Sequence, residues 1–396
     1  MNGSMSSYDV IVVGVGAMGA AACYHLARRG VRVLGLEQFG IPHALGSSHG
    51  YSRAIRLAYY EHPDYVPLLR RAYALWHELE AASGQKLLHV TGGLYLGAPG
   101  SELVEGSLRS AREHGLPHEA LTRAQVSERF PQFHGVPDDF VALWEPPAGL
   151  LLPERVVAAH AELALRHGAD LRGHETVMSW EADAHGVTVR TDRAVYTAAH
   201  LILCGGAWSE RLVRGLGVPL VVTRQVLGWV WPPRRPEQFD LAAGFPTWAI
   251  EDAASGSLFY GFPLLPDNPG FKIARHRPGA PTDPDTVVRH VLPGDEDDFR
   301  PGLDRFFPDV AGGPTLAVRV CLYVNSPDGH FLVDHHPEHP ERVTFACGFS
   351  GHGFKFASVL GEALADLAER GATDLPVGFL GLRRFPAHGT PPVAPS

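Results

Sequence analysis

Residues 9–37, DVIVVGVGAMGAAACYHLARRGVRVLGLE, decide the fold of this chain. The first five residues are a β-branched run typical of a strand buried on both faces. Residues 17–29 are rich in helix formers and stop at Gly30, and residues 31–36 form a second apolar strand. A strand, a helix and a strand in such a short stretch form a βαβ unit, whose strands run parallel through a right-handed crossover. The chain is therefore predicted to be an α/β protein built on a Rossmann-type domain.

Three glycines, Gly14, Gly16 and Gly19, lie between the first strand and the helix. In a dinucleotide-binding turn the first permits the tight turn, the second lets the backbone approach a pyrophosphate, and the third lets the helix pack on the sheet. Glu37 ends the second strand, where a carboxylate binds a ribose diol. The pattern also occurs in ordinary glycine-rich turns, but this context predicts dinucleotide binding. The later meander and Gly-Gly turn in residues 187–208 favour FAD over NAD.

The composition excludes several classes of protein. At 396 residues the chain is too long for one ordinary core, so we predict two domains. The net charge of −9 and the lack of a basic stripe argue against nucleic acid as a partner. We expect no signal peptide and no membrane span. Four scattered cysteines do not form a disulfide framework and fit a reducing cytoplasm: Cys23, Cys204, Cys321 and Cys347.

Hydrophobic periodicity predicts the remaining elements. The expected helices are residues 65–79, 153–167 and 358–370. The expected strands are residues 92–96, then 169–171, 187–191 and 195–198 in a meander, 201–203 as a buried return strand, several strands within 221–260, and 345–349. We place a discontinuous FAD-binding domain at residues 1–88, 150–216 and 322–385, and a substrate domain with a mainly antiparallel sheet at 89–149 and 217–321. The proline-rich residues 386–396 are expected to form a disordered tail.

Three further motifs carry a resemblance to a known family. They are Gly46-Ser-Ser-His-Gly-Tyr-Ser-Arg-Ala-Ile-Arg56, Cys321-Leu-Tyr323 and Gly348-Phe-Ser-Gly-His-Gly-Phe-Lys355. In this order they resemble the monomeric sarcosine oxidase and N-methyltryptophan oxidase family, a group of FAD-dependent amine oxidases. Shorter matches extend the similarity over nearly the whole chain, at residues 64–68, 260–263, 271–273 and 325–328.

The resemblance implies a covalent flavin and a site for the substrate carboxylate. In the family a cysteine thioether joins the flavin, and Cys321 matches that attachment motif. Arg56 and Lys355 match the residues that hold the carboxylate, and two cations in a closed pocket compensate one carboxylate. Lys272 matches the lysine thought to activate oxygen, where a fixed cation stabilises superoxide. The alternatives are a buried structural cysteine and ordinary solvated cations.

The other matches line the flavin and the substrate cavity. The residues expected to act in catalysis are Lys272, Arg53 and His49. The residues expected to bind substrate are Arg56, Lys355, Tyr260, His276 and Tyr323. The turn at residues 348–353 is expected to aim backbone N–H groups at the flavin pyrimidine edge. The expected FAD contacts are Gly14, Gly16, Ala17, Met18, Gly19, Glu37, Gln38, Gly46, Ser47, Arg53, Val177, Gly205, Trp208, Cys321, Gly351, His352, Gly353 and Lys355.

Three local features qualify this assignment. Residues 335–339, His-His-Pro-Glu-His, contain metal-ligand types, but the proline favours a solvated turn, so no metal is predicted. Ser48 replaces the first histidine of the family's pair, and Tyr51 stands where the family often has aspartate. These two departures bear on the substrate rather than on the reaction class.

The resemblance implies oxidative demethylation of an N-methyl amino acid, N-methyl-L-tryptophan or sarcosine. The products are the amino acid, formaldehyde and hydrogen peroxide, and molecular oxygen is the acceptor. Residues 325–328 and 355–362 look closer to the N-methyltryptophan branch. Oxidation of cyclic imino acids or glycated amino acids stays open, and so does a dehydrogenase with another electron acceptor. A non-catalytic FAD- or NAD-binding protein would not need Lys272, Arg56 and Lys355 together. We expect a monomer located in the cytoplasm.

Overall fold

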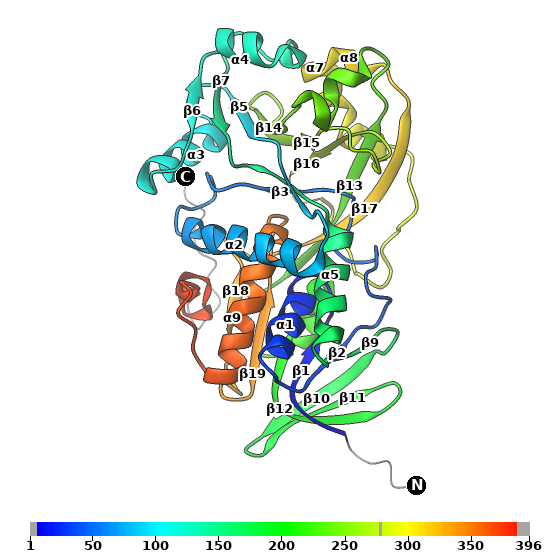
Figure 1. Cartoon of the computed structure of the whole chain (residues 1–396). Helices are drawn as coiled ribbons and strands as arrows, with labels where there is room; N and C mark the ends of the chain where they lie inside the picture. Colours follow the sequence, from blue (N-terminus) through cyan, green and yellow to red (C-terminus); the bar gives the residue numbers. More distant parts are fainter. Residues whose placement is uncertain (1–5, 277–278, 386–396) are drawn as a thin grey trace.

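A computed structural model describes residues 6–276 and 279–385, and the tail expected at residues 386–396 lies outside them. The described chain is organised around two eight-stranded sheets and one three-stranded sheet. In Figure 1 the first large sheet and its helices fill the lower part of the molecule, and the second large sheet fills the upper part.

The first sheet contains the predicted βαβ unit. Its strands are β1 (Ser6–Val13), β2 (Val33–Leu36), β9 (Asp170–Arg172), β10 (Val177–Asp183), β11 (Gly186–Thr191), β12 (Val195–Leu203), β18 (Leu332–His335) and β19 (Val343–Cys347). β1 lies between β2 and β12 and is parallel to both, while β9 extends the sheet beyond β2 and β19 pairs with β12. The buried parallel strands explain the continuous apolar runs in the sequence.

Three helices lie over this sheet, and a fourth, α2, packs on them (Figure 1). They are α1 (Ala17–Arg28), α2 (Tyr65–Ser83), α5 (Pro153–Arg166) and α9 (Ala357–Arg370). α1 packs between α5 and α9, and α2 packs on α9. α1 is rich in alanine, and a Cβ at Gly361 of α9 would collide with Ala21. Small residues therefore let these two helices approach closely, which fixes the N-terminus of α1 over the sheet edge.

The second sheet is mainly antiparallel, as predicted. In spatial order its strands are β17 (Thr315–Asn325), β13 (Val221–Val230), β16 (Phe271–Arg275), β15 (Ser257–Phe262), β14 (Thr247–Asp252), β5 (Gly93–Gly97), β7 (Val141–Glu145) and β6 (Glu119–Leu121). Only the β14–β5 pair is parallel among the described strand pairs of this sheet. An aromatic core supports it, in which Trp248 packs on Phe271 and Phe307.

A three-stranded sheet contributes a residue to the predicted site. It consists of β3 (Arg53–Ile55), β8 (Gly149–Leu151) and β4 (Leu88–Val90), and β3 carries Arg53. The remaining helices are α3 (Glu102–Glu113), α4 (Arg123–Arg129), α6 (Ser209–Leu212), α7 (Arg300–Phe306) and α8 (Pro308–Ala311). The domain limits drawn from the sequence remain a prediction.

The structure corrects the predicted meander. Residues 169–171 do not join it, because β9 pairs with β2 in the parallel part of the sheet, and β10 pairs with β11 instead. Residues 195–198 and 201–203 are one continuous strand, β12, whose first half pairs with β11 and whose second half pairs with β19. Neither α3 nor β17 was predicted from the sequence. Gly106 weakens the helical signal of α3, yet it lies against Tyr60, where a side chain would not fit.

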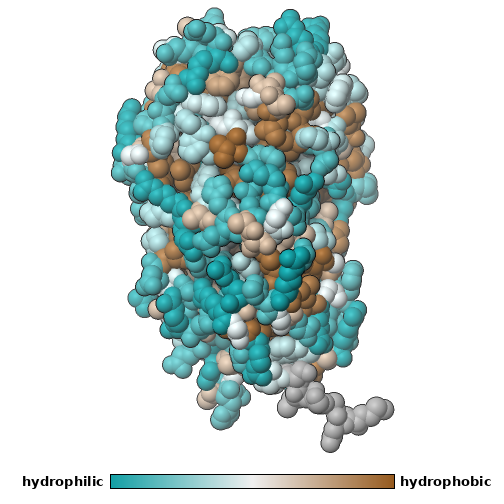
Figure 2. Space-filling view, in the orientation of Figure 1, coloured by the Kyte–Doolittle hydropathy of each residue, from teal (hydrophilic) through white to brown (hydrophobic). Residues whose placement is uncertain are grey.

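Hydrophilic residues predominate on the face shown in Figure 2, where apolar residues appear in separate groups. Such scattered apolar surface is normal for a globular protein. Among the residues that the structure describes, no helix is long and apolar enough to cross a membrane.

Candidate active site

One cavity of about 580 Å³ brings together residues from both large sheets. It is lined at one end by Glu37, after β2, and by the start of α1, and at the other by Cys321 on β17 and Tyr260 on β15. The predicted site residues on its wall are Gly14, Gly16, Ala17, Met18, Glu37, Gln38, Gly46, Ser47, Arg53, Arg56, Val177, Gly205, Trp208, Tyr260, His276, Cys321, Tyr323, Gly351, His352, Gly353 and Lys355. The predicted residues absent from the described wall are Gly19, His49 and Lys272.

The glycine-rich turn forms the nucleotide end of the cavity. Gly14 adopts a φ of 89°, and a Cβ there would collide with the carbonyl of Cys204. A Cβ at Gly19 would collide with the carbonyl of Gly14, so Gly19 serves the packing of α1 rather than the wall. Glu37 accepts hydrogen bonds from the amides of Val15 and Phe39, both at 3.0 Å, which fixes its carboxylate at the cavity edge.

This end of the cavity fits a dinucleotide. Gly16, Ala17 and Met18 place the N-terminus of α1 on the wall, where amide groups and the helix dipole favour a phosphate. Glu37 and Gln38 follow at the end of the neighbouring strand, where a ribose would lie. The same cavity continues to the second sheet, where Tyr260 and Cys321 line it.

Arg56 lies in an ion pair that the sequence did not reveal. Its Nη2 donates to both carboxylate oxygens of Glu61 at 2.7 and 2.6 Å, and the rings of Tyr59 and Tyr60 cover the guanidinium. Burial alone would raise the pKa of Glu61, but Arg56, assisted by His352 and Lys355, lowers it to about 2. Glu61 also lines the cavity. In the sequence, Glu61 is marked only by the two tyrosines that precede it.

Lys355 is the second buried cation of this end. Its Nζ donates to the carbonyl of His352 at 2.8 Å and lies 5.2 Å from the ring centre of Tyr59. Burial, followed by the charge of Arg56, lowers the pKa of Lys355 to about 7, although Glu61 acts in the opposite direction. Lys355 is therefore partly charged near neutral pH, whereas Arg56 stays fully charged.

Tyr260, His276 and Tyr323 form a polar group on the same wall. His276 Nδ1 lies 3.4 Å from the hydroxyl of Tyr323, and its ring centre lies 6.4 Å from that of Tyr260. Burial lowers the pKa of His276 to about 4, so the imidazole is neutral at physiological pH. A neutral imidazole offers a hydrogen-bond acceptor to a ligand.

Cys321 and Arg53 meet where β17 faces the small sheet. Arg53 Nη2 lies 3.3 Å from the sulfur of Cys321 and 3.1 Å from the carbonyl of Ser47, to which it donates. Cys321 is a free cysteine that is 1% exposed yet lies on the cavity wall.

Lys272 and His49 lie behind the wall rather than on it. Lys272 is fully buried, and its Nζ lies 4.8 Å from the ring centre of Phe262 and 5.4 Å from that of Trp229. Burial, followed by the charge of Arg53, holds its pKa well below the ordinary value. Burial also lowers the pKa of His49 to about 3, so this histidine is neutral.

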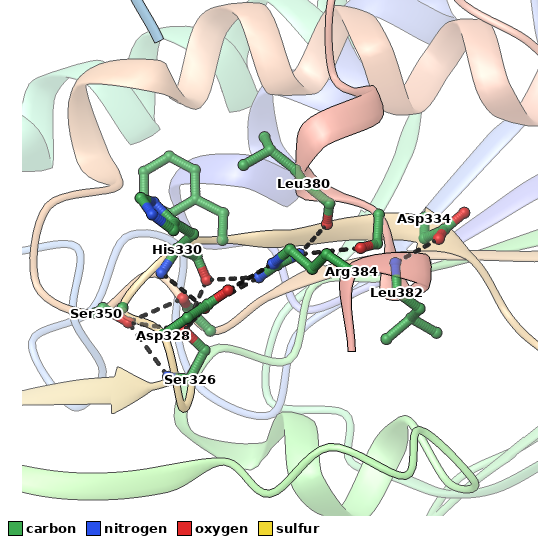
Figure 3. Close-up of polar contacts among 12 residues, drawn as sticks. Ser326, Asp328, His330, Asp334, Ser350, Leu380, Leu382 and Arg384 are labelled. Atoms are coloured by element: carbon green, nitrogen blue, oxygen red, sulfur yellow. Dashed lines mark hydrogen bonds and ion pairs between the residues drawn. The ribbon is translucent and has the colours of Figure 1, made fainter. Parts of the chain in front are cut away.

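A network around Arg384 supports the loop at residues 348–353 (Figure 3). Arg384 Nε donates to Asp328 at 2.7 Å, and its Nη1 donates to the carbonyl of Leu380 at 2.6 Å. The turn that contains Asp328 in turn holds the loop, because the amide of Ser326 donates to Ser350 at 3.2 Å. His352 Nε2 also lies 2.9 Å from the carbonyl of Gly329. No motif in the sequence points to Arg384.

Within residues 6–276 and 279–385, no group of three or more His, Cys, Asp or Glu side chains is arranged to hold a metal ion. In the segment His335–His339, His336 Nε2 lies 2.6 Å from the carbonyl of Arg214, and the rings of His336 and His339 stack.

Comparisons with known proteins agree over nearly the whole chain. The model of the FAD dependent oxidoreductase (DAO) family matches residues 9–367. The chain is 46% identical to a monomeric sarcosine oxidase of Streptomyces avermitilis over 388 residues, which cover 96% of this chain and 98% of that protein. It is 35% identical to an N-methyl-L-tryptophan oxidase of Yersinia pestis over 382 residues, 96% of this chain and 99% of that protein. Among solved structures, a point mutant of NikD, an unusual amino acid oxidase essential for nikkomycin biosynthesis, superimposes with a TM-score of 0.83 at 27% identity, covering 95% of this chain and 97% of that one.

Proposed function

This chain belongs to the FAD-dependent oxidoreductase family, in the branch of the monomeric sarcosine oxidases, and on that premise we propose that it oxidises the secondary amine of a small N-methyl amino acid. The observation that carries the proposal is the placement of Arg56 and Lys355 in the same cavity as the glycine-rich turn and Cys321. Two buried cations beside a dinucleotide site select a substrate that carries a carboxylate.

The cavity wall would hold FAD from the α1 N-terminus to the loop at residues 348–353. When bound, FAD accepts a hydride equivalent from a C–H bond next to the amine and passes the electrons to oxygen, which yields hydrogen peroxide. We further propose that Cys321 carries the flavin as a thioether. Its place on the cavity wall, in contact with Arg53, supports this assignment.

Substrate binding must rearrange the Arg56–Glu61 pair. Arg56 already engages a carboxylate, so a substrate carboxylate competes with Glu61 for the guanidinium. Lys355 donates to a backbone carbonyl and can turn toward the anion at small cost. The neutral imidazole of His276 then accepts a hydrogen bond from the substrate amine. In this arrangement the contacts of the carboxylate would set the orientation of the substrate amine.

Sarcosine takes precedence over N-methyl-L-tryptophan as the first substrate to test. The two local segments compared above favour the tryptophan branch, but identity over the whole chain is higher with the sarcosine oxidase. Molecular oxygen is the proposed acceptor, in agreement with the oxidase names of these relatives.

The first experiment is an absorption spectrum of purified protein before and after acid precipitation. Yellow colour that stays with the pellet, and is released in Cys321→Ser but not in Cys204→Ser, supports the covalent flavin. Cys204 is a matched control because it lies on the same wall. Sarcosine, N-methyl-L-tryptophan and L-pipecolate are then compared by oxygen consumption and peroxide formation. Turnover only with an added electron acceptor would show that the enzyme is a dehydrogenase and not an oxidase. Turnover of L-pipecolate alone would show that its substrates are cyclic imino acids.

A further inference from the structure

Glu154, at the start of α5, holds the backbone of residues 50–52 from one side. Its carboxylate accepts a hydrogen bond from the amide of Gly50 at 2.6 Å and from that of Tyr51 at 3.2 Å. An acidic residue in the first turn is also favoured by the helix dipole. Glu154 is half-buried and does not line the cavity described above. It therefore contacts neither the flavin site nor the substrate site directly.

Lys272 holds the same backbone from the other side. Its Nζ donates to the carbonyl of Gly50 at 2.7 Å, to the carbonyl of Ser52 at 2.6 Å, and to the Ser52 hydroxyl at 3.3 Å. An ammonium has three N–H donors, and these three acceptors use all of them. Gly50 thus joins the two charged residues, since its amide faces Glu154 and its carbonyl faces Lys272.

This backbone needs external contacts to keep its shape. Gly50 has a φ of 105° and Tyr51 a φ of 63°. A left-handed conformation costs a residue with a side chain about 1 kcal/mol or more, so it persists only where the surroundings impose it. Glu154 fixes both amides, and Arg319 fixes the Tyr51 hydroxyl at 2.6 Å. Loss of the Glu154 contacts would relax the two carbonyls that hold Lys272.

Glu154 is also the carboxylate that offsets the buried cations here. The charged and titratable groups that face Lys272 are Arg53, Glu154, Cys321 and His49. Burial and Arg53 lower the pKa of Lys272, whereas Glu154 and then Cys321 raise it. Glu154 acts in the same direction on Arg53. Removal of this negative charge would therefore disfavour the ammonium form of Lys272.

We propose that Glu154 is a positioning residue for the reaction with oxygen: it fixes residues 50–52, and through them the place and the charge of Lys272. This inference rests on the proposed oxidase function, in which a buried ammonium stabilises the negative charge that forms on oxygen. It assigns a role to a residue on a different helix from every other group of the site.

The test compares Glu154→Gln with Glu162→Gln. Glu162 lies on the same helix, is exposed and pairs with Arg166, so its variant makes the same charge change away from the site. The flavin is reduced with dithionite and mixed with oxygen in a stopped-flow instrument between pH 6 and 10. We expect Glu154→Gln to slow reoxidation about tenfold and to move its pH midpoint down by about one unit or more. Reduction by substrate should change less than twofold, and Lys272→Met should show the full loss of reoxidation.

Hydrogen exchange of the purified holoprotein gives a readout that needs no turnover. In Glu154→Ala, which removes the acceptor, the amides of residues 50 and 51 should exchange at least tenfold faster, while Glu162→Gln should match the parent. A Glu154→Gln protein with parental reoxidation rates and pH profile, or with equal losses in reduction and reoxidation, would overturn the proposal. Because dithionite replaces the substrate, failure of every N-methyl amino acid would refute the proposed function without deciding this one. Slow reoxidation of the parent protein by oxygen would rule out the proposed oxidase function. The hydrogen-exchange result would still decide whether Glu154 positions residues 50–52.

Discussion

Glu61→Gln should strengthen the binding of a simple carboxylate, because Glu61 competes with the substrate for Arg56. The pKa of Glu61 is about 2, against an ordinary value of 4.5. At about 1.4 kcal/mol per pH unit, its surroundings favour the carboxylate form by about 3 kcal/mol. Since the folded pKa lies below the unfolded one, this contribution is complete above pH 4.5 and is lost as the pH falls toward 2. It is fully present at the pH of the assay.

Acetate is the probe, and calorimetry at pH 6 measures its affinity for the enzyme with FAD bound. Lys355, with a pKa of about 7, is then mostly charged in the parent. Because Glu61 raises that pKa, the variant also loses part of the charge of Lys355, which reduces the expected gain in affinity. An anion that no longer has to displace a carboxylate should bind at least tenfold more tightly, and 3 kcal/mol sets a ceiling of about a hundredfold. The unliganded variant should also unfold more easily, because Arg56 is left without its partner.

Glu102→Gln is the matched control. Glu102 is exposed at the start of α3, so its variant removes the same charge from the outside of this region. Its affinity for acetate should stay within about twofold of the parent. An unchanged or weaker affinity for acetate in Glu61→Gln would refute the competition, and would place the carboxylate site away from Arg56.

Three other predictions concern two buried histidines, Lys355 and Arg384. Burial lowers the pKa values of His25 and His160 to about 3, so only the unfolded state binds protons at these residues as the pH falls below 6.5. Each histidine should therefore lower the free energy of unfolding by about 2 kcal/mol at pH 5. A thermal midpoint that stays level from pH 7 to pH 5 would contradict this. Because Lys355 loses its proton near pH 7, acetate affinity should fall as the pH rises from 6 to 8, and Lys355→Met should bind weakly with little dependence on pH in calorimetric titrations. Arg384→Met should release the turn that supports residues 348–353 and lower the FAD content of the purified protein, whereas Arg383→Met, on the same short segment, should retain it; equal FAD content in both variants would assign Arg384 a role in stability alone.

The sequence by itself determined the nucleotide-binding half and the family to which the chain belongs. The β1–α1–β2 unit was readable because its glycines, its buried strands and Glu37 act within thirty residues, where local backbone geometry decides the outcome. The family motifs then supplied Cys321, Arg56 and Lys355, and the structure brings all three to one cavity. The place of Lys272 behind the wall was not predicted, because a motif gives a residue type but not its exposure.

Only the tertiary structure decided the partners of these residues. Glu154 meets Gly50 across 104 positions, and Arg384 meets Asp328 across 56. The strand predicted at residues 169–171 pairs with β2 and not with the meander. The partner of a strand depends on how the whole chain folds, and the strand's own residue pattern does not specify it. Glu61 is only five positions from Arg56, yet their ion pair depends on burial, which weakens competition from water and which no local pattern records.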